Sequence, residues 1–169
     1  MAKKFVKGLE GIAAAETNLS KIDGLKGELI YRGYSIYDLA EKSSFEEVVY
    51  LLWNAKLPTK KNLNKFKKDL NKNMNLNSNI KKMIESFPKS VVPMSGLRTI
   101  VSALALYDSD SQDISEKANK RKAIRIMASM PSIVAGIQRR REGKKILNPK
   151  KNLSLAGNFL YMLKGKSPS

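Results

Sequence analysis

The side chains of this sequence that could do acid–base chemistry are carboxylates, because its 169 residues contain no histidine and no cysteine. Two groups lie close in sequence: Glu46 with Glu47, and Asp108 with Asp110 and Asp113. Neighbouring carboxylates can divide acid and base roles when their environments separate their pKa values. However, the first pair falls in the first turn of an expected helix, where the dipole favours negative charge, and the second group falls in a polar loop. We interpret both groups as structural and predict no catalytic residue.

The lack of histidine and cysteine excludes several kinds of site. There can be no Ser–His or Cys–His nucleophile pair, no imidazole acid or base, and no disulfide. The Gly-x-Gly-x-x-Gly and Walker-type phosphate loops are also missing. Gly165-Lys166-Ser167 has only the last letters of the Walker pattern, without the earlier glycine or a following helix. We therefore predict no cofactor-binding and no metal-binding residues.

Arginine and tryptophan offer two further candidates. The run Arg139-Arg140-Arg141 could hold a phosphate, but it closes an expected helix, where cations are favoured in any case. Trp53 lies at another helix end and is interpreted as a core residue rather than a stacking platform. Phosphate binding by the arginine run remains the alternative interpretation.

The charge is concentrated in the second part of the chain. Residues 1–55 hold 7 Lys/Arg and 8 Asp/Glu, whereas residues 56–169 hold 25 and 7, which accounts for the net charge of +17. Such a field can attract nucleic acid, anionic membranes or acidic partners. We favour lysines spread over solvated helix faces, and a patch that binds polyanions is the alternative.

The elements that must position these residues begin with a hairpin. Asp23-Gly24 is a turn signal between two β-prone runs, Thr17–Ile22 and Leu29–Tyr31. Ser35 can then cap a short helix over Ile36–Glu41.

Helical signals dominate from Ser44 onward. Ser44 with Glu47 forms a capping box, and apolar residues recur at helical spacing behind it. Pro131 is expected to kink or split the longest helix. One expected helix begins at Ser44, the next begins at Thr59, and a third includes Ile80–Phe87. Three more are expected over Met94–Tyr107, from Ser115 to about Arg141, and over Ser154–Lys164. The expected class is all-α with a small N-terminal β hairpin, in a single domain over residues 1–169.

Length and hydropathy bear on the expected cellular location of the chain. At 42% hydrophobic it can bury one core, and no stretch approaches the ~20 apolar residues that span a bilayer. The N-terminal lysines are not followed by an apolar segment, so no signal peptide is expected. We expect a cytoplasmic protein with no membrane partner.

Short motifs follow one another along the whole chain in a characteristic order. The longer ones are Gly8-Leu9-Glu10-Gly11, Ile22-Asp23-Gly24, Tyr31-Arg32-Gly33-Tyr34, Ser44-Phe45-Glu46-Glu47-Val48, Leu57-Pro58-Thr59, Pro93-Met94, Leu97-Arg98-Thr99, Val101-Ser102-Ala103-Leu104, Ile133-Val134-Ala135 and Asn158-Phe159-Leu160. Together they resemble the citrate synthase and 2-methylcitrate synthase family. Val92 and Ser95 depart from that pattern, which commonly has His at the first position and Asp or Ala at the second.

The resemblance implies an all-helical, usually dimeric enzyme that condenses acetyl-CoA or propionyl-CoA with oxaloacetate. In that family one Asp removes the α-proton, two His act on the enol and on the oxaloacetate carbonyl, and arginines hold the dicarboxylate. All of these come later in the family pattern than the last residue of this sequence. The resemblance therefore implies the N-terminal part of the large domain, inactive alone, and no catalytic residue is carried over.

Two other functions stay open at this point. The chain could be a non-catalytic interaction or regulatory subunit that pairs with a full-length relative. It could also be a basic nucleic-acid-binding helical protein, although charge is the only support and nucleic acid is not our expected partner. The expected partner is a second copy or a complementary citrate synthase chain. The apolar residues expected to lose part of their cover are Leu97, Ile100, Val101, Leu104, Ile133, Val134 and Ile137.

Overall fold

A computed structural model describes residues 8, 11–13 and 15–167 of the chain. Leu9 and Glu10 of the first family motif, and the N-terminal lysines behind the signal-peptide prediction, lie outside the described residues. The chain forms two compact units, Met1–Pro58 and Thr59–Ser169.

The first unit opens with the predicted hairpin, extended by one strand. Strands β1 (Ser20–Asp23) and β2 (Glu28–Tyr31) are antiparallel, and the short β3 (Tyr34–Ser35) pairs with β2. The predicted turn at Asp23-Gly24 is confirmed, because the Asp23 carboxylate accepts a hydrogen bond from the backbone N–H of Lys26 at 3.1 Å. The third strand was not predicted.

Two capped helices complete this unit. Helix α1 (Ile36–Lys42) begins after Ser35, and α2 (Phe45–Asn54) begins after Ser44, as predicted. The capping box is complete, since the Glu47 carboxylate accepts from the Ser44 backbone N–H at 2.7 Å while the Ser44 hydroxyl accepts from the Glu47 N–H. Of the apolar residues that recur at helical spacing in α2, Val49 is buried whereas Phe45 is 51% exposed, so the expected apolar face is only partly right.

Arg32 connects the sheet to the end of α2. Its backbone adopts the left-handed conformation, with φ 50°, in the turn before β3. Its guanidinium donates from Nε and Nη2 to the carbonyl of Leu52, at 3.3 and 3.1 Å, and from Nη1 to the carbonyl of Asn18. The side chain therefore supplies a donor to the C-terminal turn of α2, whose last carbonyls lack partners within the helix.

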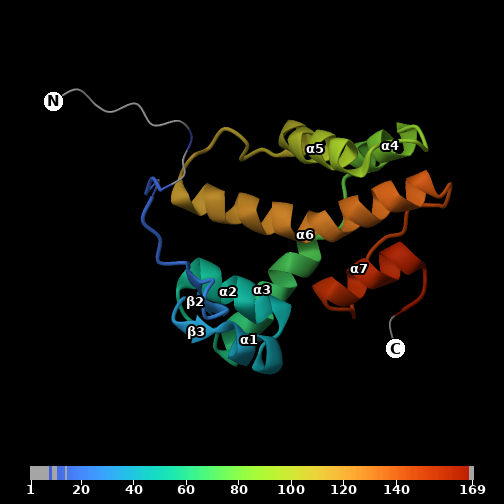
Figure 1. The fold of residues 1–169 in the computed structure, drawn as a ribbon. Coiled ribbons are helices and arrows are strands. Elements are labelled where there is room, and N and C mark those ends of the chain that lie inside the picture. Colours follow the sequence, from blue (N-terminus) through green and yellow to red (C-terminus); the bar gives the residue numbers. More distant parts are fainter. Residues whose placement is uncertain (1–7, 9–10, 14, 168–169) are drawn as a thin grey trace. The chain divides into compact units, whose positions relative to one another are not determined.

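The second unit is helical throughout its regular structure. Its elements are α3 (Lys60–Asn73), α4 (Ser78–Ser86), α5 (Pro93–Ala103), the 3₁₀ turn η1 (Leu104–Tyr107), α6 (Glu116–Arg141) and α7 (Leu155–Lys164). The expected all-α class with a small β element is thus confirmed (Figure 1). The predicted helix over Met94–Tyr107 differs in one respect: its last turn is 3₁₀.

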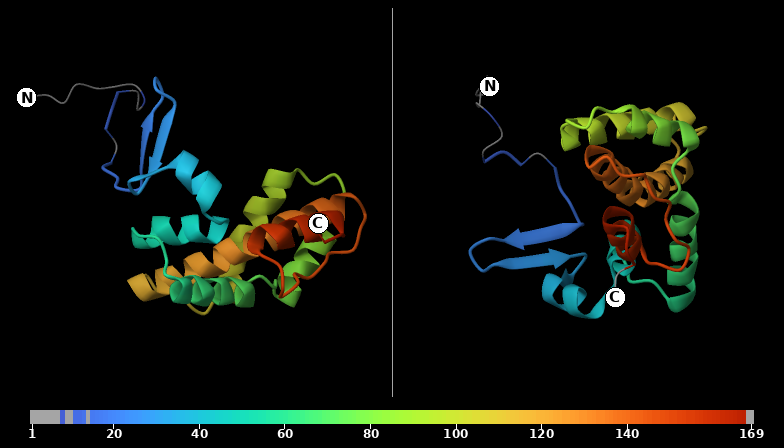
Figure 2. Two further views of the ribbon diagram at one scale, coloured as in Figure 1. Left: turned by 90° about the horizontal axis from the view of Figure 1, so that it is seen from below. Right: turned by 90° about the vertical axis from the view of Figure 1, so that its right-hand side faces the viewer.

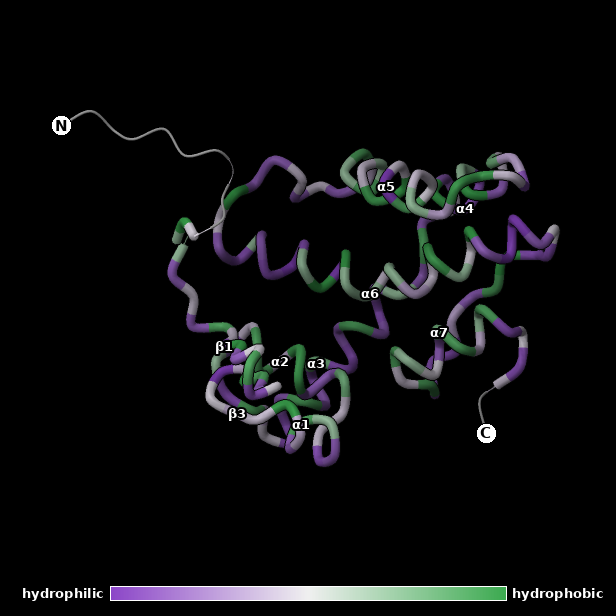
Figure 3. The backbone as a smooth tube through the Cα atoms, viewed as in Figure 1, coloured by the Kyte–Doolittle hydropathy of each residue, from purple (hydrophilic) through white to green (hydrophobic). Residues whose placement is uncertain are grey.

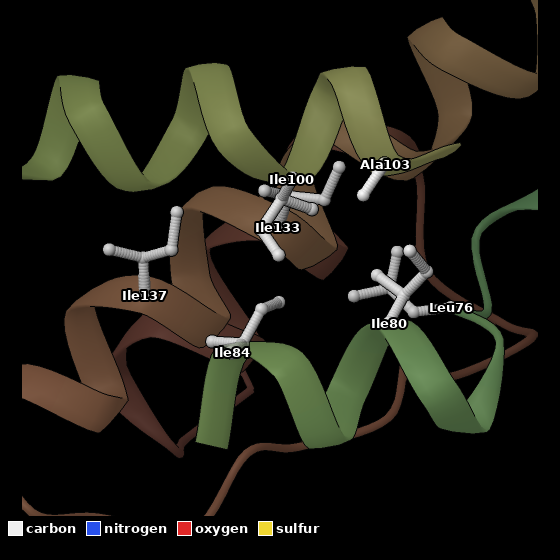
Figure 4. Packing of buried hydrophobic residues seen from close by; sticks show 7 residues of the cluster. All are labelled: Leu76, Ile80, Ile84, Ile100, Ala103, Ile133 and Ile137. Atoms are coloured by element: carbon white, nitrogen blue, oxygen red, sulfur yellow. The ribbon is translucent and has the colours of Figure 1, made fainter. Parts of the chain in front are cut away.

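Helix α6 lies at the centre of this unit. Helices α4 and α5 pack along one side of it and α7 along the opposite side (Figures 1 and 2), and α3 packs against it as well. Its two ends are hydrophilic and its middle is more hydrophobic (Figure 3). The buried cluster between α4, α5 and α6 is shown in Figure 4 and contains Leu76, Ile80, Ile84, Ile100, Ala103, Ile133 and Ile137.

Two helix positions in and beside this core, Gly96 and Pro131, carry residues that disfavour helix interiors. Gly96 of α5 is buried, and a Cβ there would lie 3.2 Å from the Phe87 ring and 3.4 Å from Ile137, so a glycine permits the close approach of α5 and α6. Pro131 lies inside α6 without splitting it, so of the two predicted outcomes, a kink or a split, the split is wrong. The helix continues because its next residue, Ser132, and the residues around it are buried against neighbouring helices.

Candidate functional site

The structure brings the predicted loop carboxylates onto two arginines of α6. Arg125 donates from Nε and Nη2 to both oxygens of Asp108, at 2.9 and 2.8 Å, and from Nη2 to Asp110 at 2.8 Å. Arg121 donates from Nε and Nη2 to both oxygens of Asp110, at 2.8 and 2.9 Å. Bidentate arginine–carboxylate pairs are the strong, well-oriented class of ion pair. We refer to these four residues as the ion-pair cluster.

Electrostatics make this cluster a poor proton donor or acceptor at neutral pH. Hydrogen bonds from Arg121 and then from Arg125 hold the pKa of Asp110 well below its usual range. The pKa of Asp113 is also lowered, first by the backbone N–H of Ser115 and then by its hydroxyl. A general base works best with a pKa near the operating pH. The geometry therefore supports our interpretation of these carboxylates as structural.

A small cleft lies beside the ion-pair cluster. Its volume is about 230 Å³, and it is lined by the turn between α3 and α4, by η1 and by the middle of α6. Leu76, Ile80 and Leu104 supply apolar surface, while Arg125 is already bonded to two carboxylates. Ligand pockets for organic molecules usually measure about 300–1,000 Å³. The arrangement braces the loop before α6 rather than forming a reaction centre.

Sequence analysis missed the arginine half of this cluster. Neither Arg121 nor Arg125 was singled out as a partner of the loop carboxylates. One local signal could have found them: arginines four residues apart lie on one face of a helix, and that helix follows directly after a loop with three aspartates.

The arginine run at the end of α6 is not assembled around a common point. Arg140 donates to the backbone carbonyl of Phe87 at 2.6 Å, Arg139 donates to that of Lys145, and Arg141 donates to the side chain of Gln138. The three guanidiniums thus stabilise chain segments near the C-terminus of the helix. This favours the structural interpretation over the phosphate site.

The remaining sequence candidates are also separated. Glu47 belongs to the capping box, whereas Glu46 is buried on another side of α2, 5% exposed. Trp53 is half-buried at the end of α2. Gly165 ends α7 in the left-handed conformation, and no helix follows it among the described residues. In the same part of the chain, no group of three or more carboxylate side chains is placed to hold a metal ion.

The apolar surface differs from the one expected. Ile100, Ile133 and Ile137 are buried in the core that α4 covers, so the expectation that they lose cover is wrong for these three, whereas Leu97, Val101 and Leu104 are partly buried at its edge. Only Val134 of that set is exposed, at 37%. The error has a simple cause, because α4 covers the face that the sequence pattern left without a partner. The large apolar residues exposed in the second unit are instead Val92, Met94, Leu106, Tyr107, Ile114, Ile126, Val134 and Leu160.

The structural role of the Asn158 side chain was not predicted from the sequence. It is fully buried in α7, and its carboxamide accepts from the backbone N–H of Lys150 at 2.7 Å while donating to the carbonyls of Lys150 and Leu153. A buried carboxamide with these partners fixes the loop before α7. It falls in the motif Asn158-Phe159-Leu160 that contributed to the family resemblance.

A family model described as citrate synthase, C-terminal domain, matches residues 8–169. The chain belongs to the citrate synthase family. Among curated relatives, the citrate synthase of Haloferax volcanii is 42% identical over 100% of this chain and 46% of its own length. The citrate/2-methylcitrate synthase of Bacillus subtilis is 37% identical over 98% of this chain and 44% of its own length.

Solved citrate synthases share the fold over the same region. The enzyme of Pyrobaculum aerophilum superposes with a TM-score of 0.89 at 35% identity, covering 95% of this chain and 42% of that one. The Thermoplasma acidophilum citrate synthase, solved as a ternary complex with carboxymethyl coenzyme A and oxaloacetate, superposes with a TM-score of 0.88 at 25% identity, covering 96% of this chain and 44% of that one. The chain therefore spans less than half the length of the relatives that it matches, and it is a partial segment of the citrate synthase fold.

No described helix of this citrate synthase segment is both long enough and apolar enough to cross a membrane. Its longest helix, α6, carries charged residues at both ends.

Proposed function

We propose that this chain forms the N-terminal part of a citrate synthase large domain and acts in condensing an acyl-CoA with oxaloacetate only together with the rest of that fold. The observation that carries this proposal is the 42% identity over the whole chain combined with coverage of 46% of the relative. In the Thermoplasma relative the ligands are a coenzyme A derivative and oxaloacetate. Acetyl-CoA and propionyl-CoA are both candidate substrates, and residues 1–169 are taken as one domain of a cytoplasmic protein.

The 169 residues alone are expected to be inactive. The family reaction, as the resemblance implies, uses two histidines, and this sequence contains none. Each general acid or base contributes roughly 10²–10⁴-fold to a rate. A chain that lacks the whole set should give no measurable condensation.

The test is a measurement of CoA release by the purified chain with oxaloacetate and either acetyl-CoA or propionyl-CoA. A thiol reagent is well suited because the chain has no cysteine to react with it. We expect no release above a blank without protein. Release that co-purifies with the chain from a host lacking its own citrate synthases would contradict the inactivity. Restoration of activity by a polypeptide that supplies the rest of the fold would support the complementary role.

We also propose that the segment associates with a second copy or with a complementary citrate synthase chain. The supporting observation is the exposed apolar surface around α5 and η1, where Met94 is 69% and Leu106 is 75% exposed. Monomeric soluble proteins rarely leave large contiguous apolar patches uncovered. The same surface would serve the alternative function, a regulatory subunit that captures a full-length relative.

Sedimentation at low and high salt tests this association. We expect the wild-type chain to form dimers or larger species more readily at high salt, where the repulsion from its charge of +17 is screened. The double variant M94Q/L106Q should shift the distribution toward monomer. A compact monomer at both salt concentrations, for wild type and variant alike, would contradict the proposal.

A further inference from the structure

Helix α3 presents four lysines in a single row. The helix reads KKNLNKFKKDLNKN and contains six lysines and one acid, Asp69. Lys61, Lys65, Lys68 and Lys72 are all exposed, at spacings of four, three and four residues. At 100° per residue these positions fall within an arc of about 60°, and at 1.5 Å per residue they extend over about 16 Å. We call these four residues the lysine stripe.

The stripe lies opposite the buried side of α3. Phe66 and Leu70, which the spacing of 100° per residue places on the other side of the helix, are buried, 7% and 1% exposed. Helix α3 packs against α6. Figure 2 shows α3 in green at the edge of the second unit. Both observations leave the stripe open for contact with another molecule.

The lysines of the stripe have no acidic partner among the described residues. All the ion pairs of the second unit involve α6 or the residues next to it, and Asp69 enters none of them. Like charges three or four residues apart on a helix repel one another. Burial of the opposite face of α3 offsets the repulsion among these lysines, and binding of an anionic partner would reduce that repulsion.

The surroundings of the stripe favour one kind of polyanion. Its exposed neighbours on α3 include Asn62 and Asn64, and no large apolar residue of α3 is exposed. A helix that binds a membrane surface inserts an apolar face beside its lysines, and α3 has none to insert. Lysine and asparagine side chains are typical contacts to nucleic-acid phosphates and sugars.

The spacing agrees with a phosphate backbone. Successive phosphates of one DNA strand advance about 3.4 Å along the axis, so about 16 Å corresponds to about five phosphates. Because the stripe contains no arginine and no aromatic residue, it has neither the side chain that most often reads guanine nor a platform for stacking bases.

We propose that the lysine stripe of α3 binds the phosphate backbone of nucleic acid without sequence preference. This goes beyond the proposed function and does not depend on it, since it concerns one helix face and no acyl-CoA chemistry. From charge alone, nucleic acid was not the expected partner. The structure adds that the four lysines are exposed in one row and that they have no acidic partner among the described residues.

The test is fluorescence anisotropy of a labelled 20-base-pair DNA duplex with the full chain, between 50 and 200 mM salt. Four phosphate contacts predict a slope of about −3.6 for log K against log salt, which is a loss of about a hundredfold over this range. The variant K61Q/K65Q/K68Q/K72Q should lose most of the affinity and nearly all of the slope. The half variants K61Q/K65Q and K68Q/K72Q should each lose about half the slope, so the result does not depend on one variant folding.

The matched control removes the same charge elsewhere. Four lysines that are exposed and make no ion pair with a described residue are Lys82, Lys117, Lys151 and Lys166. The quadruple glutamine variant at these positions has the same net charge as the stripe variant and should keep the wild-type slope. Equal losses in both variants, or no salt-dependent binding by wild type, would overturn the proposal. Tighter binding to phosphatidylserine vesicles than to the duplex at equal salt would overturn it in favour of a membrane, and a tenfold preference between two duplex sequences would overturn the lack of sequence preference.

Discussion

Along α6, the C-terminal half is buried and the N-terminal half is exposed. Between Ala128 and Ile137, five residues besides these two are buried, whereas Ala118 is the one buried residue between Glu116 and Arg125. The exposed half is fixed instead by the ion-pair cluster, which ties it to the loop before it. One continuous helix is thus stabilised by apolar packing from its middle toward the C-terminus and by charge near its N-terminus.

The two halves of α6 should therefore differ in how their contributions to stability respond to salt and pH. Burial of apolar surface depends little on salt or pH in the ordinary range, whereas ion pairs between partly exposed groups are weakened by both. Substitutions in the two halves of α6 should therefore differ in size and in their response to solution conditions.

The largest effect is expected from Ile133→Ala in the buried half. Ile133 is fully buried between α4, α5 and α6, so truncation leaves a cavity and should lower the free energy of unfolding by about 2–5 kcal/mol. The neighbouring Val134→Ala is the matched control, because Val134 is 37% exposed. Urea unfolding measures both, and equal losses would show that the helix is not packed on one face as described.

A smaller effect is expected from Ser132→Ala. Its hydroxyl donates to the backbone carbonyl of Met74 at 2.8 Å and is buried, so removal leaves an acceptor without a partner and should cost about 1–3 kcal/mol. Ser129→Ala is the control, since among the described residues the Ser129 hydroxyl bonds to a carbonyl of its own helix, that of Ile126. A control that loses as much as Ser132→Ala would rule out a special role for the contact between α6 and α3.

The smallest effect is expected from Arg125→Met, and its signature is in the pH dependence. The folded-state pKa of Asp110 is depressed, first by Arg121 and then by Arg125, so its contribution to stability is present above the unfolded pKa of about 3.9 and is lost as pH falls through the folded pKa. The variant raises the folded pKa toward its usual value. Its stability should therefore fall less steeply than that of wild type between pH 4 and more acidic conditions.

Lys117→Met provides the comparison for that prediction. Lys117 is exposed on the same half of α6 and makes no ion pair with a described residue. It should leave the acid dependence unchanged while altering the net charge equally. Parallel acid profiles for wild type and Arg125→Met would show that the ion-pair cluster contributes nothing measurable.

Local signals in the sequence predicted most of the fold. Ser35, Ser44, Thr59, Ser115 and Ser154 each cap a helix where expected, because a capping bond joins residues two or three positions apart. The class and the helix order followed from these caps and from the apolar spacing.

Contacts between distant residues were not accessible in the same way. The bond from Ser132 to Met74 joins residues 58 positions apart, and the cover that α4 gives to Ile133 depends on tertiary packing. The candidate site shows the same limit, since its aspartates were found in the sequence but their pairing with Arg121 and Arg125 was not. The unsplit helix at Pro131 is a further case in which packing outweighs a local breaker.

The uneven burial of α6 has a consequence for how long its backbone hydrogen bonds last. Amide hydrogens exchange with water through openings whose free energy ranges from near zero at frayed ends to that of complete unfolding in the core. The turns between Glu116 and Arg125 can open without disturbing the cluster around Ile133, so their amides should exchange early. The turns around Ile133 can open only with the whole core. The backbone hydrogen bonds thus make α6 one continuous helix, but we expect two segments that differ in how fast their amides exchange.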